Sequence, residues 1–509
     1  MNIAAVIFSV LVASVLLLGF LAARWKRGDL TQLHEWGLGG RQFGTIISWF
    51  LIGGDVYTAY TFIAVPALMF GAGAVAFFAV PYTIVCYPIL YVVFPKLWRV
   101  CTKYGFVTGP EFVRGRYGNR WLALAVGVTG IAATMPYIAL QLVGMQTVIG
   151  GLEPRSWLGG NLSLGMAFVV LAAFTYTSGL RASAMIAVVK DTLIYLTIVV
   201  AVLVIPAKLG GFGQIFSKVA SEKILLPHPT SASTGMYSGY ATLALGSAMA
   251  LFLYPHTTTG ILSASSGRVI RRNAVILPTY SFMLGLIALL GAMAIAANVE
   301  TMPQFASGFN EFGTSFAVPA LLIETLPNWF VGIAFAAIAI GALVPAAIMA
   351  IASANIFSRD IWREFISPKP VPDNESKIAR YFAIVVIIGA LAFIYCLPLK
   401  YAIELQLLGG MWMIQVLPAV VFSLFTRFYN GWALLVGWSV GFLLATHYAL
   451  ANHLAGAIYA FHFFGLTVPC YIALWTLVVN VIVSTALSPI FHAFLPDRIY
   501  DITMESDYV

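Results

Sequence analysis

Two stretches of the chain place helix-breaking residues and polar side chains inside long apolar runs. In the first, LIGGDVYTAYTFIAVP, Gly53 and Gly54 come directly before Asp55, and Tyr57 and Thr58 follow. Glycine favours local unwinding of a helix, and a carboxyl inside a membrane needs a water-lined or paired site. Asp55 could therefore carry a proton or hold a cation, and Tyr57 and Thr58 could donate hydrogen bonds to a bound carboxylate. In the alternative interpretation, Asp55 only accepts hydrogen bonds from freed backbone amides.

The second stretch, ALFLYPHTTTG, contains Pro255, which removes a backbone donor and tends to kink or break a helix. Tyr254, His256 and Thr257 lie at this break. A histidine with an ordinary pKa near 6.5 suits proton exchange or anion binding. The alternatives are a neutral histidine at a kink and threonines that bond back to helix carbonyls.

The composition of the chain requires a lipid environment for most of its surface. Of its 509 residues, 61% are hydrophobic and only 9% are charged, which is too few to cover a water-facing surface. The apolar runs are continuous, not alternating, and this favours membrane-spanning helices over a barrel. The four cysteines lack CxxC spacing, so we expect free thiols and no disulfide or metal site.

The apolar runs predict an all-α polytopic membrane protein with about thirteen spans in one domain. The first run is long, lacks a preceding basic segment and is followed by basic residues, which favours a retained helix over a signal peptide. The predicted spans are 3–23, 44–70, 73–99, 121–147, 161–178, 184–207, 237–262, 274–298, 327–356, 378–397, 399–426, 430–449 and 468–490.

The distribution of basic residues predicts the orientation of these spans. With the N-terminus outside and the C-terminus in the cytoplasm, 22 of the 27 basic residues fall on the inner side. The segment 318–326 is predicted as a short helix on the outer surface, and the acidic tail 497–509 as a frayed end. The net charge of +8 is explained by this topology and does not indicate nucleic-acid binding.

The two breaks occur in spans that lie five apart in the chain. Two five-helix repeats, about 44–207 and 237–426, would each begin with an interrupted helix, and an odd helix number inverts the second copy. Paired interrupted helices are the best sequence pointer to a transporter's midplane site. Alternatively, each break is only a packing kink. The helices 3–23, 430–449 and 468–490 would be peripheral, and Tyr137 and Gln141, four residues apart, could line the same cavity.

Four ordered motifs resemble the sodium:solute symporter family. They are TGPEFVRGRYG, TYTSGLRASAMIAVVKDTLIY, YPHTTTGILSASSGRVIRR, and Gln406 followed by LPAVVFSLFTRFYNGWALLVGWSVG. The resemblance implies a leucine-transporter-type 5+5 inverted repeat with extra helices at each end. Within the family, LYPHTTTGILSASS and GALVPAAIMAIASANIFSRDIW are most similar to bacterial monocarboxylate permeases.

The resemblance also implies roles for Asp191 and Gln406. Asp191 matches an acid on the family's inner ion route, although it could instead pair with a loop base. Lys190 beside it could supply a fixed positive charge in place of sodium, although a lysine that snorkels to the interface is commoner. Gln406 matches a position that faces the bound solute.

The chain departs from the family where many members hold sodium with an Ala-x-x-Ser-Ser/Thr pattern. The matching stretch, aligned through Asp360, is 341–345, and both hydroxyl positions are apolar. Gly260 also stands where family members often have arginine. The loss of the two hydroxyls makes proton coupling credible, so both H⁺ and Na⁺ remain open as the coupling ion.

The sequence thus predicts a symporter that imports a small monocarboxylate, such as lactate or pyruvate, by alternating access in a bacterial inner membrane. Its partners would be the solute, the coupling ion and the lipid bilayer, with no nucleic acid and no organic cofactor or resident metal. Alternative solutes are an amino acid, pantothenate and acetate, and an alternative function is a channel or solute sensor. The chain lacks a phosphate loop, HExxH and GxSxG, so no enzyme is predicted.

Overall fold

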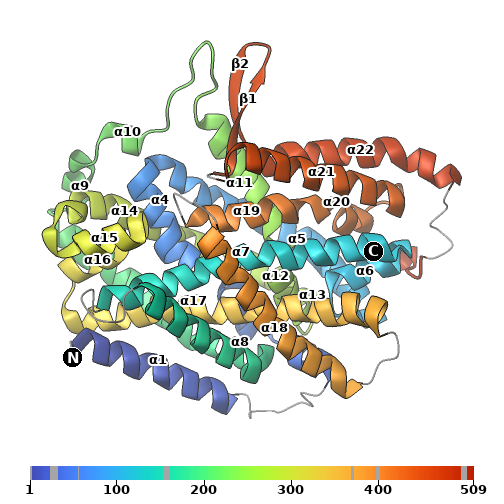
Figure 1. The fold of residues 1–509 in the computed structure, drawn as a ribbon, viewed down its shortest axis with the longest axis horizontal. Helices are drawn as coiled ribbons and strands as arrows, with labels where there is room; N and C mark the ends of the chain where they lie inside the picture. Colours follow the sequence, from blue (N-terminus) through green and yellow to red (C-terminus); the bar gives the residue numbers. More distant parts are fainter. Residues whose placement is uncertain are drawn as a thin grey trace.

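The fold is a bundle of long helices with one β-hairpin at its edge (Figure 1). The structure is a computed structural model. The described residues are 3–22, 32–54, 57–152, 160–367, 372–396, 402–454, 456–494 and 501–508.

The helices and strands have the following bounds. The first half contains α1 (Ile3–Ala22), α2 (Leu33–Leu38), α3 (Thr45–Gly54), α4 (Val65–Ala72), α5 (Ala79–Tyr104), α6 (Gly109–Tyr117), α7 (Arg120–Leu152), α8 (Gly160–Lys208), α9 (Phe212–Lys218), α10 (Ser221–Ile224), α11 (Tyr237–Leu251) and α12 (Pro255–Leu262). The second half contains α13 (Gly267–Ile276), α14 (Pro278–Ala296), α15 (Ala306–Phe312), α16 (Ala317–Thr325), α17 (Asn328–Ile356), α18 (Pro372–Cys396), α19 (Ile403–Met413), α20 (Leu417–Val420), α21 (Gly431–Ala451), β1 (Ile458–Phe463), β2 (Leu466–Tyr471) and α22 (Ile472–Phe494).

Nine helical segments within the described residues are long and apolar enough to cross a membrane, and shorter apolar helices accompany them. The predicted spans lie mainly on helix where the structure describes them, although residues 468–471 of the last span belong to β2, and the predicted helical membrane fold is confirmed. The fifth and sixth spans form one element, α8, which is kinked at Gly179, where φ is +65°. The left-handed region suits glycine because it has no Cβ.

Helix α17 lies at the centre of the bundle and is buried along almost its whole length. It packs against α1, α7, α8 and α18. Its sequence is rich in alanine and glycine, and small side chains let neighbouring membrane helices approach closely. Figure 1 shows α1 along one edge of the bundle and α21 and α22 along the opposite edge.

The hairpin of β1 and β2 was not predicted. The strands are antiparallel, with Ile458 opposite Tyr471 and Phe463 opposite Leu466. Both turn residues, Phe464 and Gly465, have positive φ, as tight hairpin turns require. The hairpin also bonds to the long loop after α10, where the Thr467 N–H donates to the Ala232 carbonyl at 2.8 Å.

The predicted surface helix at 318–326 is present as α16, but its predicted position on the surface is wrong. Val318, Leu321 and Leu322 are each almost fully buried. The helix packs against α4, α14 and α17. An apolar nine-residue helix gains more by burying all its faces than by lying on the bundle.

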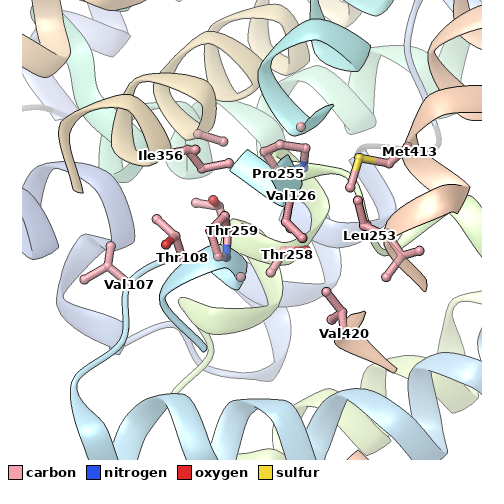
Figure 2. A pocket seen from close by; sticks show the side chains of 15 residues that line it. Val107, Thr108, Val126, Leu253, Pro255, Thr258, Thr259, Ile356, Met413 and Val420 are labelled. Carbon is pink, nitrogen blue, oxygen red and sulfur yellow. The ribbon is translucent and has the colours of Figure 1, made fainter. Parts of the chain in front are cut away.

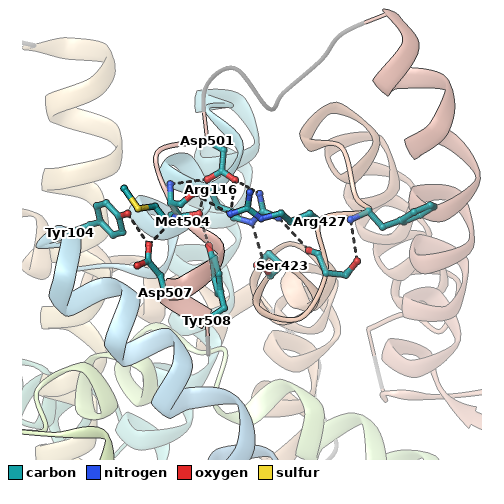
Figure 3. A network of polar contacts seen from close by, with 11 residues as sticks. Tyr104, Arg116, Ser423, Arg427, Asp501, Met504, Asp507 and Tyr508 are labelled. Atoms are coloured by element: carbon teal, nitrogen blue, oxygen red, sulfur yellow. Dashed lines mark hydrogen bonds and ion pairs between the residues drawn. The ribbon is translucent and has the colours of Figure 1, made fainter.

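The predicted fraying of the C-terminal tail is also wrong for residues 501–508, which dock on the bundle (Figure 3). Arg116, from α6, pairs with Asp501 at 2.6 Å, and the Tyr104 hydroxyl donates to Asp507 at 2.8 Å. Lys103 also pairs with Asp507. Burial alone would raise the pKa of Asp507, but hydrogen bonds from Lys103, Tyr104 and the Met504 N–H outweigh it and lower the pKa.

These contacts bring together residues that the charge distribution predicts on one side of the membrane. Arg181 pairs with Glu35 at 2.9 Å, and Arg359 lies 3.8 Å from Glu111. Arg114 and Glu364 form a further pair. The predicted inner loops and the docked tail therefore meet at one end of the bundle.

Candidate transport site

The first predicted break is present between α3 and the helix that follows it. α3 ends at Gly54, residues 57 and 58 are not helical, and a π-helical turn at Tyr60–Ala64 leads into α4. The Thr58 hydroxyl accepts the Tyr60 N–H at 3.0 Å, which leaves its own O–H available as a donor. Asp55 lies outside the described residues.

A buried lysine meets the carbonyls that this break frees. The Lys190 ammonium, from α8, donates to the Gly54 and Tyr57 carbonyls, both at 2.9 Å. The same Nζ lies 2.8 Å from Asp191 Oδ1, and the Tyr280 hydroxyl donates to Asp191 Oδ2 at 2.8 Å. Lys190 and Asp191 have no exposed side-chain surface, so the snorkelling and loop-pairing alternatives are both wrong.

Three tyrosines enclose this ion pair. The ring centroid of Tyr57 lies 4.5 Å from that of Tyr280 and 5.5 Å from that of Tyr195. The Tyr57 hydroxyl donates to the Tyr280 carbonyl at 3.2 Å, so Tyr57 belongs to the wall of the ion pair. Gly53 is required here, since a Cβ would lie 2.4 Å from the Tyr280 ring. Sequence reasoning missed Tyr195 and Tyr280, whose positions in apolar runs carried no signal.

The second predicted break separates α11 from α12. Tyr254 is extended, with ψ of 141°, directly before the first turn of α12. The Thr257 hydroxyl donates to the Leu251 and Tyr254 carbonyls at 2.7 and 2.9 Å, and the Thr258 hydroxyl donates to Phe252 at 2.9 Å. The Tyr254 carbonyl also accepts the Thr258 N–H at 3.0 Å, so the freed carbonyls that the neutral hydroxyls meet are those of Leu251 and Phe252. This is the alternative that the sequence left open for the threonines.

An aromatic cluster surrounds the start of α12. The ring of His256 lies 5.5 Å from Tyr137 and 5.4 Å from Tyr254, between ring centroids. The Tyr254 hydroxyl donates to the Gln406 carbonyl at 3.1 Å, which links α12 to α19. His256 is fully buried, and neither of its ring nitrogens has a hydrogen-bond partner among the described residues.

Further buried polar groups lie on the helices around the two breaks. Gln141 Oε1 accepts the Ala59 N–H at 3.0 Å, which ties α7 to the first break. Within the described part of the chain, Gln141 Nε2, the Tyr60 hydroxyl and Gln406 Oε1 have no partner. Leaving such groups unsatisfied is costly, and a bound polar solute would remove that cost. Tyr60 was missed, although it follows the predicted break by only a few residues.

The two breaks lie on helices that pack together. α12 contacts α3, and a Cβ on Gly260 would lie 3.8 Å from Leu51 and Ile52 side-chain atoms. Tyr137 and Gln141 lie on one face of α7, which contacts α12, α19 and the turn at Tyr60–Ala64. The structure thus brings the predicted site residues on α7, α12 and α19 into one region, while Tyr57, Lys190 and Asp191 form a separate cluster.

A pocket opens beside the second break (Figure 2). It lies between the start of α6 and helices α7, α12, α17 and α20. Thr108, Thr258 and Thr259 provide its hydroxyls, and Thr108 donates to Asp360 at 2.7 Å. His256 and Gln406 do not line it. The described residues contain no group of three His, Cys, Asp or Glu side chains that could hold a metal ion.

Comparisons with known proteins agree with this architecture. Residues 36–441 match the model of the sodium:solute symporter family. A protein of Rhizobium johnstonii named "Monocarboxylate transport permease protein" is 50% identical over 436 residues, covering 84% of this chain and 85% of its own. The "Uncharacterized symporter YodF" of Bacillus subtilis is 32% identical, covering 96% of this chain and 93% of its own.

A solved structure shares the fold. The substrate-bound outward-open state of a Na⁺-coupled sialic acid symporter aligns with a TM-score of 0.77 at 16% identity, covering 96% of this chain and 98% of that one. The predicted leucine-transporter-type fold is therefore confirmed. The chain belongs to the sodium:solute symporter family.

Proposed function

We propose that this symporter imports a small monocarboxylate by alternating access, with its N-terminus outside and its C-terminus in the cytoplasm. The observation that carries the proposal is the pair of interrupted helices, α3 and α11–α12, with unsatisfied buried polar groups beside them. The relative named as a monocarboxylate permease, half of whose aligned residues are identical, supports the solute class.

The chemistry of the unsatisfied groups suits a small anion with an apolar remainder. Tyr60 Oη and Gln141 Nε2 are donors, which a carboxylate can accept from. Tyr137 lies one turn before Gln141 on α7, and its ring packs against those of Tyr254 and His256. The solute would bind with its carboxylate towards Tyr60 and Gln141 and its carbon chain against these rings.

The coupling ion would be a proton or sodium. A coupling ion is expected in this family, and the structural neighbour is Na⁺-coupled. The protein would act within a bacterial inner membrane, with lipid around its apolar surface, and without an enzymatic reaction. The predicted repeats, about 44–207 and 237–426, would supply the parts that move.

The proposal can be tested with purified protein in proteoliposomes. Labelled lactate or pyruvate should enter vesicles preloaded with the same unlabelled acid, because a carrier exchanges its solute. Gln141→Leu should weaken this exchange at least about tenfold through the loss of one charge-assisted hydrogen bond. Thr192→Val, on an exposed face of α8, is the control and should exchange normally.

The outcomes separate the alternatives. Flux that follows the gradient without exchange would indicate a channel, and no flux would indicate a sensor. Exchange of an amino acid, pantothenate or acetate in place of lactate and pyruvate would reassign the solute.

A further inference from the structure

The surroundings of the Lys190 ammonium resemble the ligand set of a bound metal cation. Two backbone carbonyls at the end of a broken helix and one carboxylate surround it, at 2.8–2.9 Å. Such oxygen atoms are the ligands that hard cations take. Half-helix ends of this kind coordinate coupling ions in transporters with interrupted helices. Here the cation in that position is covalently part of the chain.

The helix that faces this position offers no further side-chain oxygen from its nearest stretch. α17 packs along α8, and a Cβ on Gly341 would lie 3.2 Å from Ile194, one turn beyond Lys190. Residues 341–345 are buried and apolar. The ammonium donates two hydrogen bonds to carbonyls and forms an ion pair with one carboxylate, whereas a hard metal ion takes more oxygen ligands. The site therefore fits the ammonium.

We propose that the Lys190 ammonium permanently occupies the cation position at the first break, and that the Lys190–Asp191 pair carries a coupling proton in place of sodium. This inference rests on the proposed symport function. In each cycle, one Nζ–H bond would break and the proton would pass to water on the inner side. The lysine would remain as an amine beside the Asp191 carboxylate. Water on the outer side would return one proton to the amine.

The groups that face Lys190 are consistent with one exchangeable proton. Asp191 supplies the only carboxylate found there among the described residues. Tyr57, Tyr195 and Tyr280 supply phenols, which are normally neutral at physiological pH. The facing stretch of α17 supplies no titratable side chain. Asp55 follows Gly54 in the sequence and is outside the described residues.

The first experiment asks which gradient drives the wild-type protein. We expect an inward proton gradient to accumulate labelled lactate in proteoliposomes without sodium, and a sodium gradient alone to give no accumulation. We also expect the Tm of the purified protein to be the same in sodium chloride and in choline chloride. Accumulation driven by sodium alone, or a sodium-dependent rise in the wild-type Tm, would overturn the inference.

Two variants of Lys190 test the role of the side chain. Lys190→Arg keeps the positive charge but cannot release a proton, so it should exchange lactate yet lose proton-driven accumulation. Lys190→Ala vacates the position, but the oxygen ligands that remain are too few for a hard metal ion, so sodium should not raise its Tm. Lys208→Ala, at the exposed end of the same helix, should behave as the wild type in both assays.

The results also separate this inference from the proposed function. If the wild type exchanges no small monocarboxylate, the solute proposal fails, but the Tm measurements still test the cation position. If Lys190→Ala does not fold, Lys190→Arg still tests whether the lysine carries the coupling proton. Proton-driven accumulation by Lys190→Arg at the wild-type level would refute the proton role.

Discussion

The two interrupted helices differ in the side chains that donate hydrogen bonds to their freed backbone carbonyls. Each break leaves backbone carbonyls without their helical donors, and in both cases those carbonyls are buried. At the first break a lysine ammonium, neutralised by Asp191, donates to them. At the second break the donors are the hydroxyls of Thr257 and Thr258. Matching positions in a fold therefore need not carry matching electrostatics.

This difference indicates that the two breaks have different roles in transport. At the first break, the rings of Tyr57, Tyr195 and Tyr280 pack around the Lys190–Asp191 ion pair. The neutral break lies beside His256, whose ring nitrogens are unpaired within the described residues, and beside the pocket lined by Thr258 and Thr259. We expect coupling to depend on the ion pair at the first break, and solute recognition to depend on Tyr60 and Gln141 together with the aromatic rings at the second break.

The largest effect is expected from breaking the buried ion pair. Asp191→Ala would leave the Lys190 ammonium uncompensated, at a cost of about 3–5 kcal/mol. The double variant Lys190→Met/Asp191→Leu should recover most of that stability but not proton-driven accumulation. Thermal unfolding in detergent measures the first result and proteoliposome uptake the second. Wild-type stability of Asp191→Ala would show that the pair is not a buried charge pair.

A glycine-to-alanine comparison of the two breaks should give the next largest effect. Gly53→Ala places a Cβ 2.4 Å from the Tyr280 ring and should cost about 1–3 kcal/mol. Gly260→Ala, whose Cβ would lie 3.8 Å from its nearest neighbours, should be tolerated. Tyr280→Leu should partly rescue Gly53→Ala in the same unfolding assay. Equal destabilisation by the two alanines would contradict the difference in packing.

Removing one threonine hydroxyl at the neutral break should have a moderate effect. Thr257→Val leaves the Leu251 and Tyr254 carbonyls without this donor, at a cost of about 1–2 kcal/mol. Thr257→Ser keeps the hydroxyl and should unfold close to the wild type. A valine variant as stable as the serine variant would mean that water replaces the hydroxyl.

Replacing the histidine should change solute affinity more than pH dependence. His256→Gln keeps a polar side chain against Tyr137 and Tyr254, so we expect a severalfold rise in the KM for lactate. If coupling resides at the first break, the shape of the pH profile should be unchanged. A displaced profile would instead place a coupling proton on His256.

The smallest effect is expected from the charged contacts outside the membrane. Asp507→Asn removes a carboxylate whose pKa is lowered in the docked tail. The stabilisation that this carboxylate contributes to the folded state is fully present at pH values above its usual pKa near 3.8. It is lost as the pH falls through the lowered pKa of the folded state. At neutral pH the variant should transport normally, with a slightly lower Tm, because surface ion pairs contribute little. A loss of transport as large as that of Asp191→Ala would place the tail in the transport mechanism.

The sequence by itself determined the helical membrane fold and the location of both breaks. In lipid, a continuous apolar run can satisfy its backbone hydrogen bonds only by forming a helix. Gly53, Gly54 and Pro255 interrupt the helix locally, at the turns in which they lie. The same local rules say nothing about contacts between distant segments. These rules therefore did not predict the hairpin of β1 and β2, the burial of α16 or the docking of residues 501–508.

Only the tertiary structure decided which donors reach the bared carbonyls. Lys190 lies more than a hundred residues after Gly54, and Tyr280 is nearly ninety residues after Asp191. No pattern within either segment requires these side chains to meet. They are neighbours because α8 packs against α3 and α14, and in that packing a buried charge is stable only with its partners in place.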